Sequence, residues 1–311
     1  MLFNSLGERF GLLSGGCVEQ KLQTVATQCI REQVCKHVFF ALDAADDDLA
    51  TNSAQNKDTE NRINDYAQQQ DWQTAIGCGG SLKIAIIPLN QHNQYLAFEQ
   101  LHATLVAGKD SQLTIEITEN SPAARIKAHW SALSATVPLV TASASLDHSG
   151  SKLTINLPAP TRLLIAGAGI DAIPLANMAT ELGWDVAINE PRTSYRKAHL
   201  FPATSKTLAE DYSSEKMLAA MKNSHCIIIM HHNLALDGKA LFAAQSSNAD
   251  YIGVLGPKSR LDRILNLGNC DRAAFNGNLY GPCGIGIGGD SPSSVALSIL
   301  SHCHQVISKR V

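Results

Sequence analysis

No apolar run in this chain of 311 residues comes near the roughly 18 residues that a membrane-spanning helix needs. The chain also lacks an excess of basic residues, since 25 Lys and Arg stand against 28 Asp and Glu. Its first residues contain no basic segment, long apolar core or cleavage site of a secretion signal. These absences argue against a membrane partner, a nucleic-acid partner and secretion.

The spacing of the cysteines in this chain does not fit an ordinary zinc site. The eight cysteines are spread along the chain, and no Cys-x-x-Cys pair occurs. Scattered cysteines without a dense framework are typical of the reducing cytoplasm. We therefore expect a cytoplasmic protein, without a metal site made only of protein ligands.

The chain does contain a dinucleotide-binding motif. An apolar run ends in Gly167-Ala-Gly169, Ala172 follows, and a helical pattern begins there. In this motif the first glycine permits a tight turn, and the second lets a phosphate approach the backbone. The small third residue lets the helix pack closely on the strand. An acid about 20 residues later binds a ribose hydroxyl, and Glu190 stands in that position.

The pattern around this motif predicts an α/β protein. Apolar runs alternate with helical patterns from the motif to the end of the chain, with strands predicted at 163–166, 185–189, 226–230 and 250–255, and helices at 171–182, 214–222, 237–246, 256–266 and from 292 onward. The prediction is an N-terminal α/β domain at 1–118, a linker rich in Ser, Ala and Thr at 119–152, and a C-terminal Rossmann-type parallel-sheet domain at 153–311. In the first domain we expect a helix after Cys17, a strand at 38–42, and paired strands between Leu105 and Ile117.

Two cysteines stand in glycine-rich turns of the first domain. Cys17 follows two glycines at the predicted start of a helix, where backbone N–H groups and the helix dipole favour the thiolate. Cys78 is flanked by glycines, which leave room for a bulky ligand. Each is either a nucleophile and soft-metal ligand, or a small buried apolar side chain as free cysteines commonly are.

Further candidates follow the predicted strands of the second domain, where Rossmann folds bind ligands. His231 and His232 end one strand, and Asp237 comes five residues after His232. These residues either orient a ligand and move a proton, or the histidine ends the strand and Asp237 caps the next helix. Arg192 and Arg260 each bind a phosphate or pair with an acid of the protein. The Gly-rich segment at 281–289, which includes Gly284 and Gly286, is suited to a phosphate.

Taken in order, these segments resemble the XdhC family, the accessory proteins that serve xanthine dehydrogenase and related molybdenum hydroxylases. The similar segments span nearly the whole chain: Ser14-Gly-Gly-Cys17-Val-Glu19, Gly77-Cys78-Gly-Gly80, Leu163 to Ala176, Leu182-Gly-Trp184, Glu190-Pro-Arg192, Phe201-Pro202, His232 with Asp237, Tyr251 to Gly256, and Gly281 to Gly288. The family usually has His at the position of Ile170, Asp at that of Glu190, and Pro-Ile-Gly-Leu in the last loop. Its members carry more chain before the Gly-Gly-Cys segment, so this chain is expected to be short at its N-terminus.

The resemblance implies a cytoplasmic homodimer that binds molybdenum cofactor, either molybdopterin or its dinucleotide form. Such a protein supports sulfuration of the cofactor and delivers it to an apo xanthine dehydrogenase-type hydroxylase, with a cysteine desulfurase as a second partner. It is a maturation factor rather than an enzyme in its own right. Cys17 and Cys78 would bind the molybdenum, and the full cofactor-binding set would be Cys17, Cys78, Gly167, Gly169, Glu190, Arg192, His232, Asp237, Gly284 and Gly286.

The alternative is an NAD(P)-dependent oxidoreductase, or a dinucleotide-binding protein without chemistry. It would use the same Gly167 turn, with Glu190 on a free ribose hydroxyl and therefore NAD in preference to NADP. No Tyr-x-x-x-Lys set for hydride transfer follows the motif, since Tyr195 is followed by Arg196-Lys197. A nicotinamide absorbance change with aldehydes, ketones or purines would favour the oxidoreductase.

Overall fold

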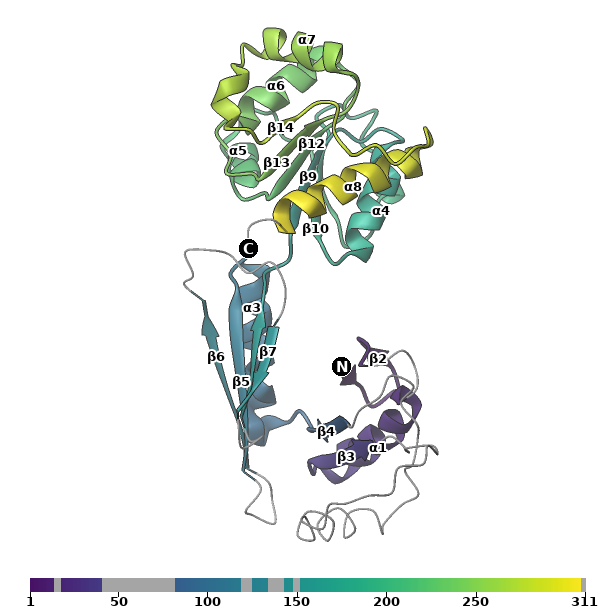
Figure 1. Cartoon of the computed structure of the whole chain (residues 1–311), viewed down its shortest axis with the longest axis vertical. Helices are drawn as coiled ribbons and strands as arrows, with labels where there is room; N and C mark the ends of the chain where they lie inside the picture. The colour runs from purple at the N-terminus through teal and green to yellow at the C-terminus, as the bar shows by residue number, and fades with distance from the viewer. Residues whose placement is uncertain (14–17, 41–81, 119–124, 134–142, 148–151, 309–311) are drawn as a thin grey trace, which may run out of the picture. The chain divides into compact units, whose positions relative to one another are not determined.

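The computed structural model describes residues 1–13, 18–40, 82–118, 125–133, 143–147 and 152–308 (Figure 1). The chain divides into two compact units. The first consists of Met1–Glu99, Thr114–Trp130 and Ser145–Thr154, and the second of Gln100–Leu113, Ser131–Ala144 and Ile155–Val311. In the described part of the chain, no helix combines the length and apolar character that crossing a bilayer requires.

The second unit contains a six-stranded sheet in the order β11-β10-β9-β12-β13-β14. Its neighbouring strands are all parallel, and their bounds are β9 (Arg162–Ala166), β10 (Asp185–Asn189), β11 (Lys206–Leu208), β12 (Cys226–Ile229), β13 (Tyr251–Val254) and β14 (Leu279–Tyr280). Counted from β9, this is the 3-2-1-4-5-6 order of dinucleotide-binding folds. The predicted α/β class and the Rossmann-type half are therefore confirmed. The order reverses between β9 and β12, which is where such folds bind their ligands.

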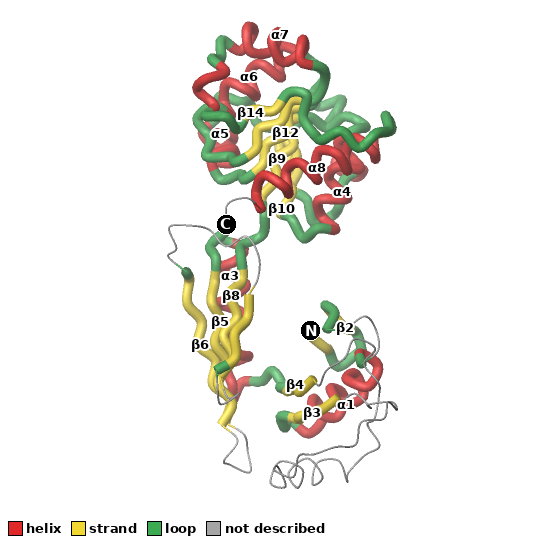
Figure 2. Tube along the Cα trace, viewed as in Figure 1, coloured by secondary structure: helices red, strands yellow, loops and turns green. Residues whose placement is uncertain are grey.

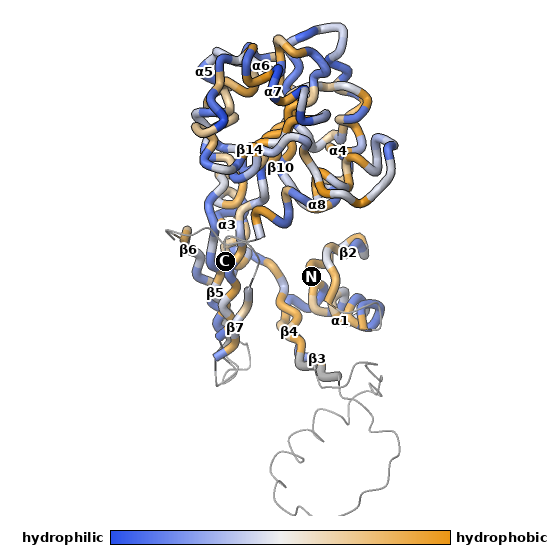
Figure 3. Tube along the Cα trace, turned by 45° about the horizontal axis from the view of Figure 1, so that its top comes forward, coloured by the Kyte–Doolittle hydropathy of each residue, from blue (hydrophilic) through white to orange (hydrophobic). Residues whose placement is uncertain are grey.

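Helices cover both faces of this sheet (Figure 2). One hydrophobic cluster includes residues of α4 (Ala172–Glu181) and α8 (Pro292–Ser308), and the other includes residues of α5 (Glu215–Lys222), α6 (Leu234–Ala244) and α7 (Lys258–Gly268). Along β9, Leu163 and Ile165 belong to the first cluster, and Leu164 and Ala166 to the second. Because both faces of the sheet are buried, its central strands consist of nearly continuous runs of apolar residues in the sequence. The hydrophobic colouring of the strands is visible in Figure 3.

The first unit contains smaller elements. Strands β1 (Leu2–Phe3) and β2 (Arg9–Phe10) pair antiparallel, as do β3 (Lys36–Phe40) and β4 (Leu82–Ile86). Helix α1 (Glu19–Glu32) contributes Leu22 to a small core with Val18 and Val38. These elements correspond to the helix predicted after Cys17 and to the strand predicted at 38–42.

The prediction of paired strands between Leu105 and Ile117 is wrong. Only Leu105 and Val106 of this segment belong to helix α3 (Phe98–Val106); a turn follows at 107–108, and the second part of the segment is a strand, β5 (Ser111–Thr118). Leu101 and Thr104 are buried three residues apart on one face of the helix, so helical spacing outweighs the strand preference of β-branched residues here. A short 3-10 helix, η1 (Gln91–Ala97), precedes α3, and the described residues include two more 3-10 helices, η2 (Ala198–Leu200) and η3 (Arg272–Phe275).

The segment predicted as a linker, 119–152, contains two strands. These are β6 (Arg125–Ala132) and β7 (Ser143–Leu146), which join β5 and β8 (Lys152–Leu157) in a four-stranded sheet of order β6-β5-β8-β7. The linker prediction relied on local composition, whereas strand formation here depends on partners elsewhere in the chain. The domain boundaries at 118 and 153 stay predictions.

Candidate functional site

The Gly167 turn joins β9 to α4 at the carboxyl edge of the sheet. Gly167 has a φ of +123°, and a Cβ added to it would lie 2.7 Å from the backbone carbon of Met230 and 2.8 Å from the backbone nitrogen of His231. Only glycine fits this backbone and this close approach. At Gly169 an added Cβ would meet, among the described residues, only the His232 ring, at 3.9 Å. The surface at the second glycine is therefore open to a ligand.

Three consecutive backbone N–H groups at this turn are available for a ligand. Among the described residues, none accepts a hydrogen bond from the N–H groups of Gly169, Ile170 or Asp171. The next two N–H groups, of Ala172 and Ile173, donate to the carbonyls of Gly169 and Ile170 at 3.0 and 3.4 Å. Unpaired donors at the start of a helix attract anions, and the helix dipole adds to the attraction.

Glu190, the acid after β10, is fully buried, with a side-chain exposure of 0%. Its Oε2 accepts from the N–H of Ala168 at 3.2 Å and from Arg192 Nη2 at 2.9 Å. Its Oε1 accepts from the backbone N–H and the Nε of Arg192, at 3.0 and 2.8 Å. Burial alone would raise the pKa of this carboxyl, but the hydrogen bonds from Arg192 and Ala168 outweigh burial and lower the pKa. Glu190 is thus ionised, and its carboxylate is hydrogen-bonded to groups of the protein itself.

Arg192 bridges the ends of β10 and β12. Besides its two side-chain bonds to Glu190, its Nη2 donates to the carbonyl of His231 at 3.3 Å. The guanidinium lies over the Tyr195 ring, 3.9 Å from the ring centroid. The bond to Glu190 raises the pKa of Arg192, and the side chain keeps an exposure of 26%. Arg192 therefore presents a fixed positive charge at this edge of the sheet.

Asp237 is a second buried acid, and its hydrogen bonds hold the loop after β12. Asp237 Oδ1 accepts from the backbone N–H of His231 at 3.1 Å and lies 2.9 Å from its Nδ1. Arg260 Nη2 donates to the other carboxylate oxygen of Asp237, and the Tyr212 hydroxyl lies 2.9 Å from His231 Nε2. Since a carboxylate only accepts, the Nδ1 of His231 carries a proton and donates it to Asp237. Burial raises the pKa of Tyr212, so its hydroxyl stays protonated.

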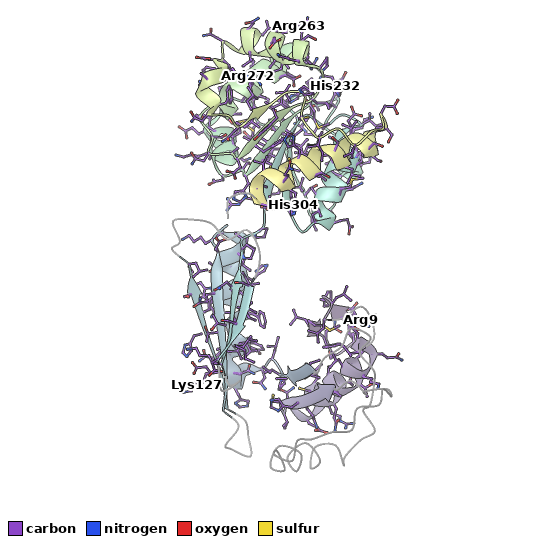
Figure 4. All side chains as sticks on the ribbon, in the orientation of Figure 1. Arg9, Lys127, His232, Arg263, Arg272 and His304 are labelled. Atoms are coloured by element: carbon purple, nitrogen blue, oxygen red, sulfur yellow. The ribbon has the colours of Figure 1, made fainter. Side chains whose placement is uncertain are left out.

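His232, next in the chain, has a left-handed backbone with a φ of +57°. Such a φ is uncommon for a residue other than glycine, and the neighbouring His231–Asp237 contacts hold the loop that adopts it. The His232 side chain is 56% exposed, and its Nε2 lies 3.0 Å from Asp171 Oδ2 (Figure 4). The loop thus places an imidazole next to the open surface at Gly169.

The structure brings together six of the predicted cofactor-binding residues through direct or shared contacts: Gly167, Gly169, Glu190, Arg192, His232 and Asp237. The sequence carried no signal for Tyr212, and it left Arg260 between two interpretations. Arg260 pairs with an acid of the protein. Spacing along the chain could not reveal these contacts, because they join residues from different elements.

The final glycine loop is not joined to this group. The N–H of Gly284 donates to the Tyr251 hydroxyl at 3.0 Å, and a Cβ on Gly284 would lie 2.4 Å from Ser298 Oγ. Gly286 is exposed, and no described atom lies within 4 Å of a Cβ added there. Among the residues described, neither glycine is hydrogen-bonded to the Gly167 turn. In the same loop, burial raises the pKa of Cys283 to about 12, so this thiol is protonated near neutral pH.

The two predicted molybdenum ligands, Cys17 and Cys78, lie outside the described residues. Within the described ranges, no group of three or more His, Cys, Asp or Glu side chains is arranged to hold a metal ion. The part of the site that the structure describes consists of backbone N–H groups, one arginine and one histidine, which are groups that can donate hydrogen bonds to an anion.

A parallel sheet in this order, with a glycine turn after its first strand, defines a Rossmann-type nucleotide-binding fold. Residues 163–303 match the model of the XdhC Rossmann domain family. The chain thus carries an XdhC Rossmann domain, and the predicted family resemblance is confirmed.

Two known proteins are similar to nearly the whole chain. A protein of Bacillus subtilis (strain 168), whose name describes it as a probable xanthine dehydrogenase subunit, is 27% identical over 322 residues, which cover 98% of this chain and 86% of that protein. A crystal structure of a Bacillus halodurans protein named xanthine dehydrogenase is 22% identical, with a TM-score of 0.66, and covers 99% of this chain and 86% of that chain. The second comparison shows a shared fold.

Proposed function

We propose that this protein is an accessory factor that binds molybdenum cofactor and delivers it to a xanthine dehydrogenase-type hydroxylase in the cytoplasm. The observation that carries the proposal is the anion site at the Gly167 turn, within an XdhC Rossmann domain. The names of the similar proteins support the link to xanthine dehydrogenase. A homodimer and a cysteine desulfurase partner belong to the same proposal.

A cofactor that carries a phosphate fits the described residues. The N–H groups of residues 169–171 would bind phosphate oxygens, and Gly169 lets the ligand approach the backbone. Arg192 supplies charge from the end of β10, and His232 supplies a hydrogen-bonding imidazole from the end of β12. When bound, the metal centre would supply the exchange of an oxo ligand for sulfur, with Cys17 and Cys78 as its proposed protein ligands.

The test is cofactor retention by the purified full-length protein. Cofactor released from a molybdenum hydroxylase is incubated with the protein, free ligand is removed by gel filtration, and retained pterin and molybdenum are quantified. We expect both to be retained in equal molar amounts. Retention no better than that of an unrelated protein of similar size would contradict the proposal.

Dinucleotide binding without hydride transfer is the second candidate. The strand order and the three available N–H groups at the Gly167 turn favour it. A dinucleotide that binds in a calorimetric titration, without turnover and with no pterin retained, would replace the first proposal by this one. A nicotinamide absorbance change would instead indicate an oxidoreductase.

A further inference from the structure

The acid at the end of β10 has no acceptor site left for a ligand. A carboxylate offers about four lone-pair sites. Four hydrogen bonds, one from Ala168 and three from Arg192, reach the two oxygens of Glu190. The Glu190 side chain is also 0% exposed. In Rossmann folds that bind NAD, the acid at this position accepts from a ribose hydroxyl, and here that interaction is blocked.

Arg192 is the charged group that this position presents instead. Its plane is fixed by the two bonds to Glu190 and by the Tyr195 ring beneath it. Among the described residues, none accepts a hydrogen bond from its Nη1. A preorganised guanidinium with a remaining donor is suited to a phosphate oxygen.

We propose that Arg192 binds a phosphate monoester of the ligand at the end of β10, where related folds bind a ribose diol through an acid. The inference rests on the proposed ligand site at the Gly167 turn, and it names the group that this site selects. Glu190 is then a positioning residue, which holds the guanidinium and ties it to Ala168 in the turn. The expected preference is for the phosphorylated ligand, the reverse of the NAD preference predicted from Glu190 in the sequence.

Two sources could supply such a group, so the experiment has two arms. One arm compares NADP⁺ with NAD⁺, which differ by a monoester on the ribose. The other arm compares molybdenum cofactor in its molybdopterin form, which ends in a phosphate monoester, with the cytosine dinucleotide form, in which that phosphate is esterified further. Dissociation constants for the full-length protein are measured by calorimetry in the first arm and by retention at graded concentrations in the second.

We expect the monoester-bearing ligand to bind at least about tenfold tighter in one of the arms, and that arm identifies the source. In Arg192→Gln the ratio should fall to about one. Arg263→Gln removes the same charge from the exposed outer surface of α7 (Figure 4), and it should keep the wild-type ratio. Circular dichroism checks that the variants fold. The affinity ratio of the wild-type protein tests the inference even if a variant does not fold.

Ratios near one, or reversed, in both arms would overturn the inference. So would an unchanged preference in folded Arg192→Gln. If the cofactor is retained but both of its forms bind equally and NADP⁺ has no advantage, the proposed function stands and only this inference fails. If the protein retains no cofactor but prefers NADP⁺ to NAD⁺, the inference stands and the proposed function fails.

Discussion

Gly167 is a residue at which a single methyl group should disrupt the ligand site. In Gly167→Ala the positive φ costs about 1–3 kcal/mol, and the overlap with the backbone at Met230 and His231 adds about 1–3 kcal/mol. We expect the free energy of unfolding to fall by at least about 2 kcal/mol, and ligand retention to be lost. Urea denaturation followed by circular dichroism measures the first effect.

Gly286→Ala is the matched control for stability. No described atom lies within 4 Å of a Cβ added there, so the free energy of unfolding should stay within about 0.5 kcal/mol of wild type. Equal effects of the two substitutions would show that Gly167 is not held against the β12 loop as the structure describes.

Glu190 should make stability depend on acid pH. Its pKa in the folded protein is below the ordinary value, so the ionised carboxylate stabilises the fold above about pH 4.3. That contribution is lost as the pH falls through the folded pKa. In Glu190→Gln we expect a smaller loss of stability between about pH 5 and about pH 3. At neutral pH the variant should be about 3–5 kcal/mol less stable, because Arg192 loses its partner.

Glu181→Gln, which changes an exposed carboxyl at the end of α4, is the control. Urea denaturation of all three proteins across this pH range measures the slopes. A Glu190→Gln slope as steep as that of wild type would show that the acid sensitivity arises elsewhere.

The glycine spacing predicted the Gly167 turn because the backbone requirement is local. The hydrogen-bond partners of the Glu190 carboxylate were not predictable in the same way. Its distance along the chain indicated a ribose ligand, yet Arg192, two residues later, folds back and fills its acceptor sites together with Ala168. The partners of Asp237 come from the loop after β12 and from α7, and no sequence pattern records such contacts.

At the scale of elements, α6 and α7 pack closely through two glycines. An added Cβ on Gly268 would lie 2.7 Å from the carbonyl oxygen of Gly238. Gly→Ala in a helix commonly gains up to about 1 kcal/mol, but the overlap here costs about 1–3 kcal/mol. We therefore expect Gly268→Ala to lower the free energy of unfolding by about 1–2 kcal/mol, measured by urea denaturation.

Leu267→Ala, at a side chain that is 61% exposed in the same turn, should change stability by no more than about 0.5 kcal/mol. A stabilised Gly268→Ala would mean that the two helices can separate without cost, contrary to the close packing described.

Elements with a buried, continuous apolar run were predictable: β9, β10, β12 and β13 lie where the sequence indicated. The short strands β11 and β14, of three and two residues, have too few residues to show a period and form because β10 and β13 offer edges to pair with. Leu105 and Val106 were predicted as part of a strand, whereas burial of Leu101 and Thr104 on one face favours helix α3.

For the whole molecule, the proposal divides the work between two parts of the chain. In this proposal the Rossmann domain binds the phosphate of the ligand at the ends of β9, β10 and β12, and the proposed metal ligands belong to the preceding part of the chain. Cys17→Ala and Cys78→Ala should therefore lower molybdenum retention without weakening the binding of the phosphate group. Gly167→Ala should lower both molybdenum retention and phosphate binding. Retained molybdenum, retained pterin and the affinity for NADP⁺ are measured on the same preparations.

We expect each cysteine variant to lose molybdenum by at least about tenfold, because a thiolate ligand to a soft metal has no substitute in alanine. Cys270→Ala changes a half-buried thiol beside Gly268, and it should retain wild-type levels of metal and pterin. Wild-type retention in both Cys17→Ala and Cys78→Ala would remove the cysteines from the site and leave the phosphate group as the cofactor's main attachment. Loss of NADP⁺ affinity in the cysteine variants would instead show that the two functions are not separable.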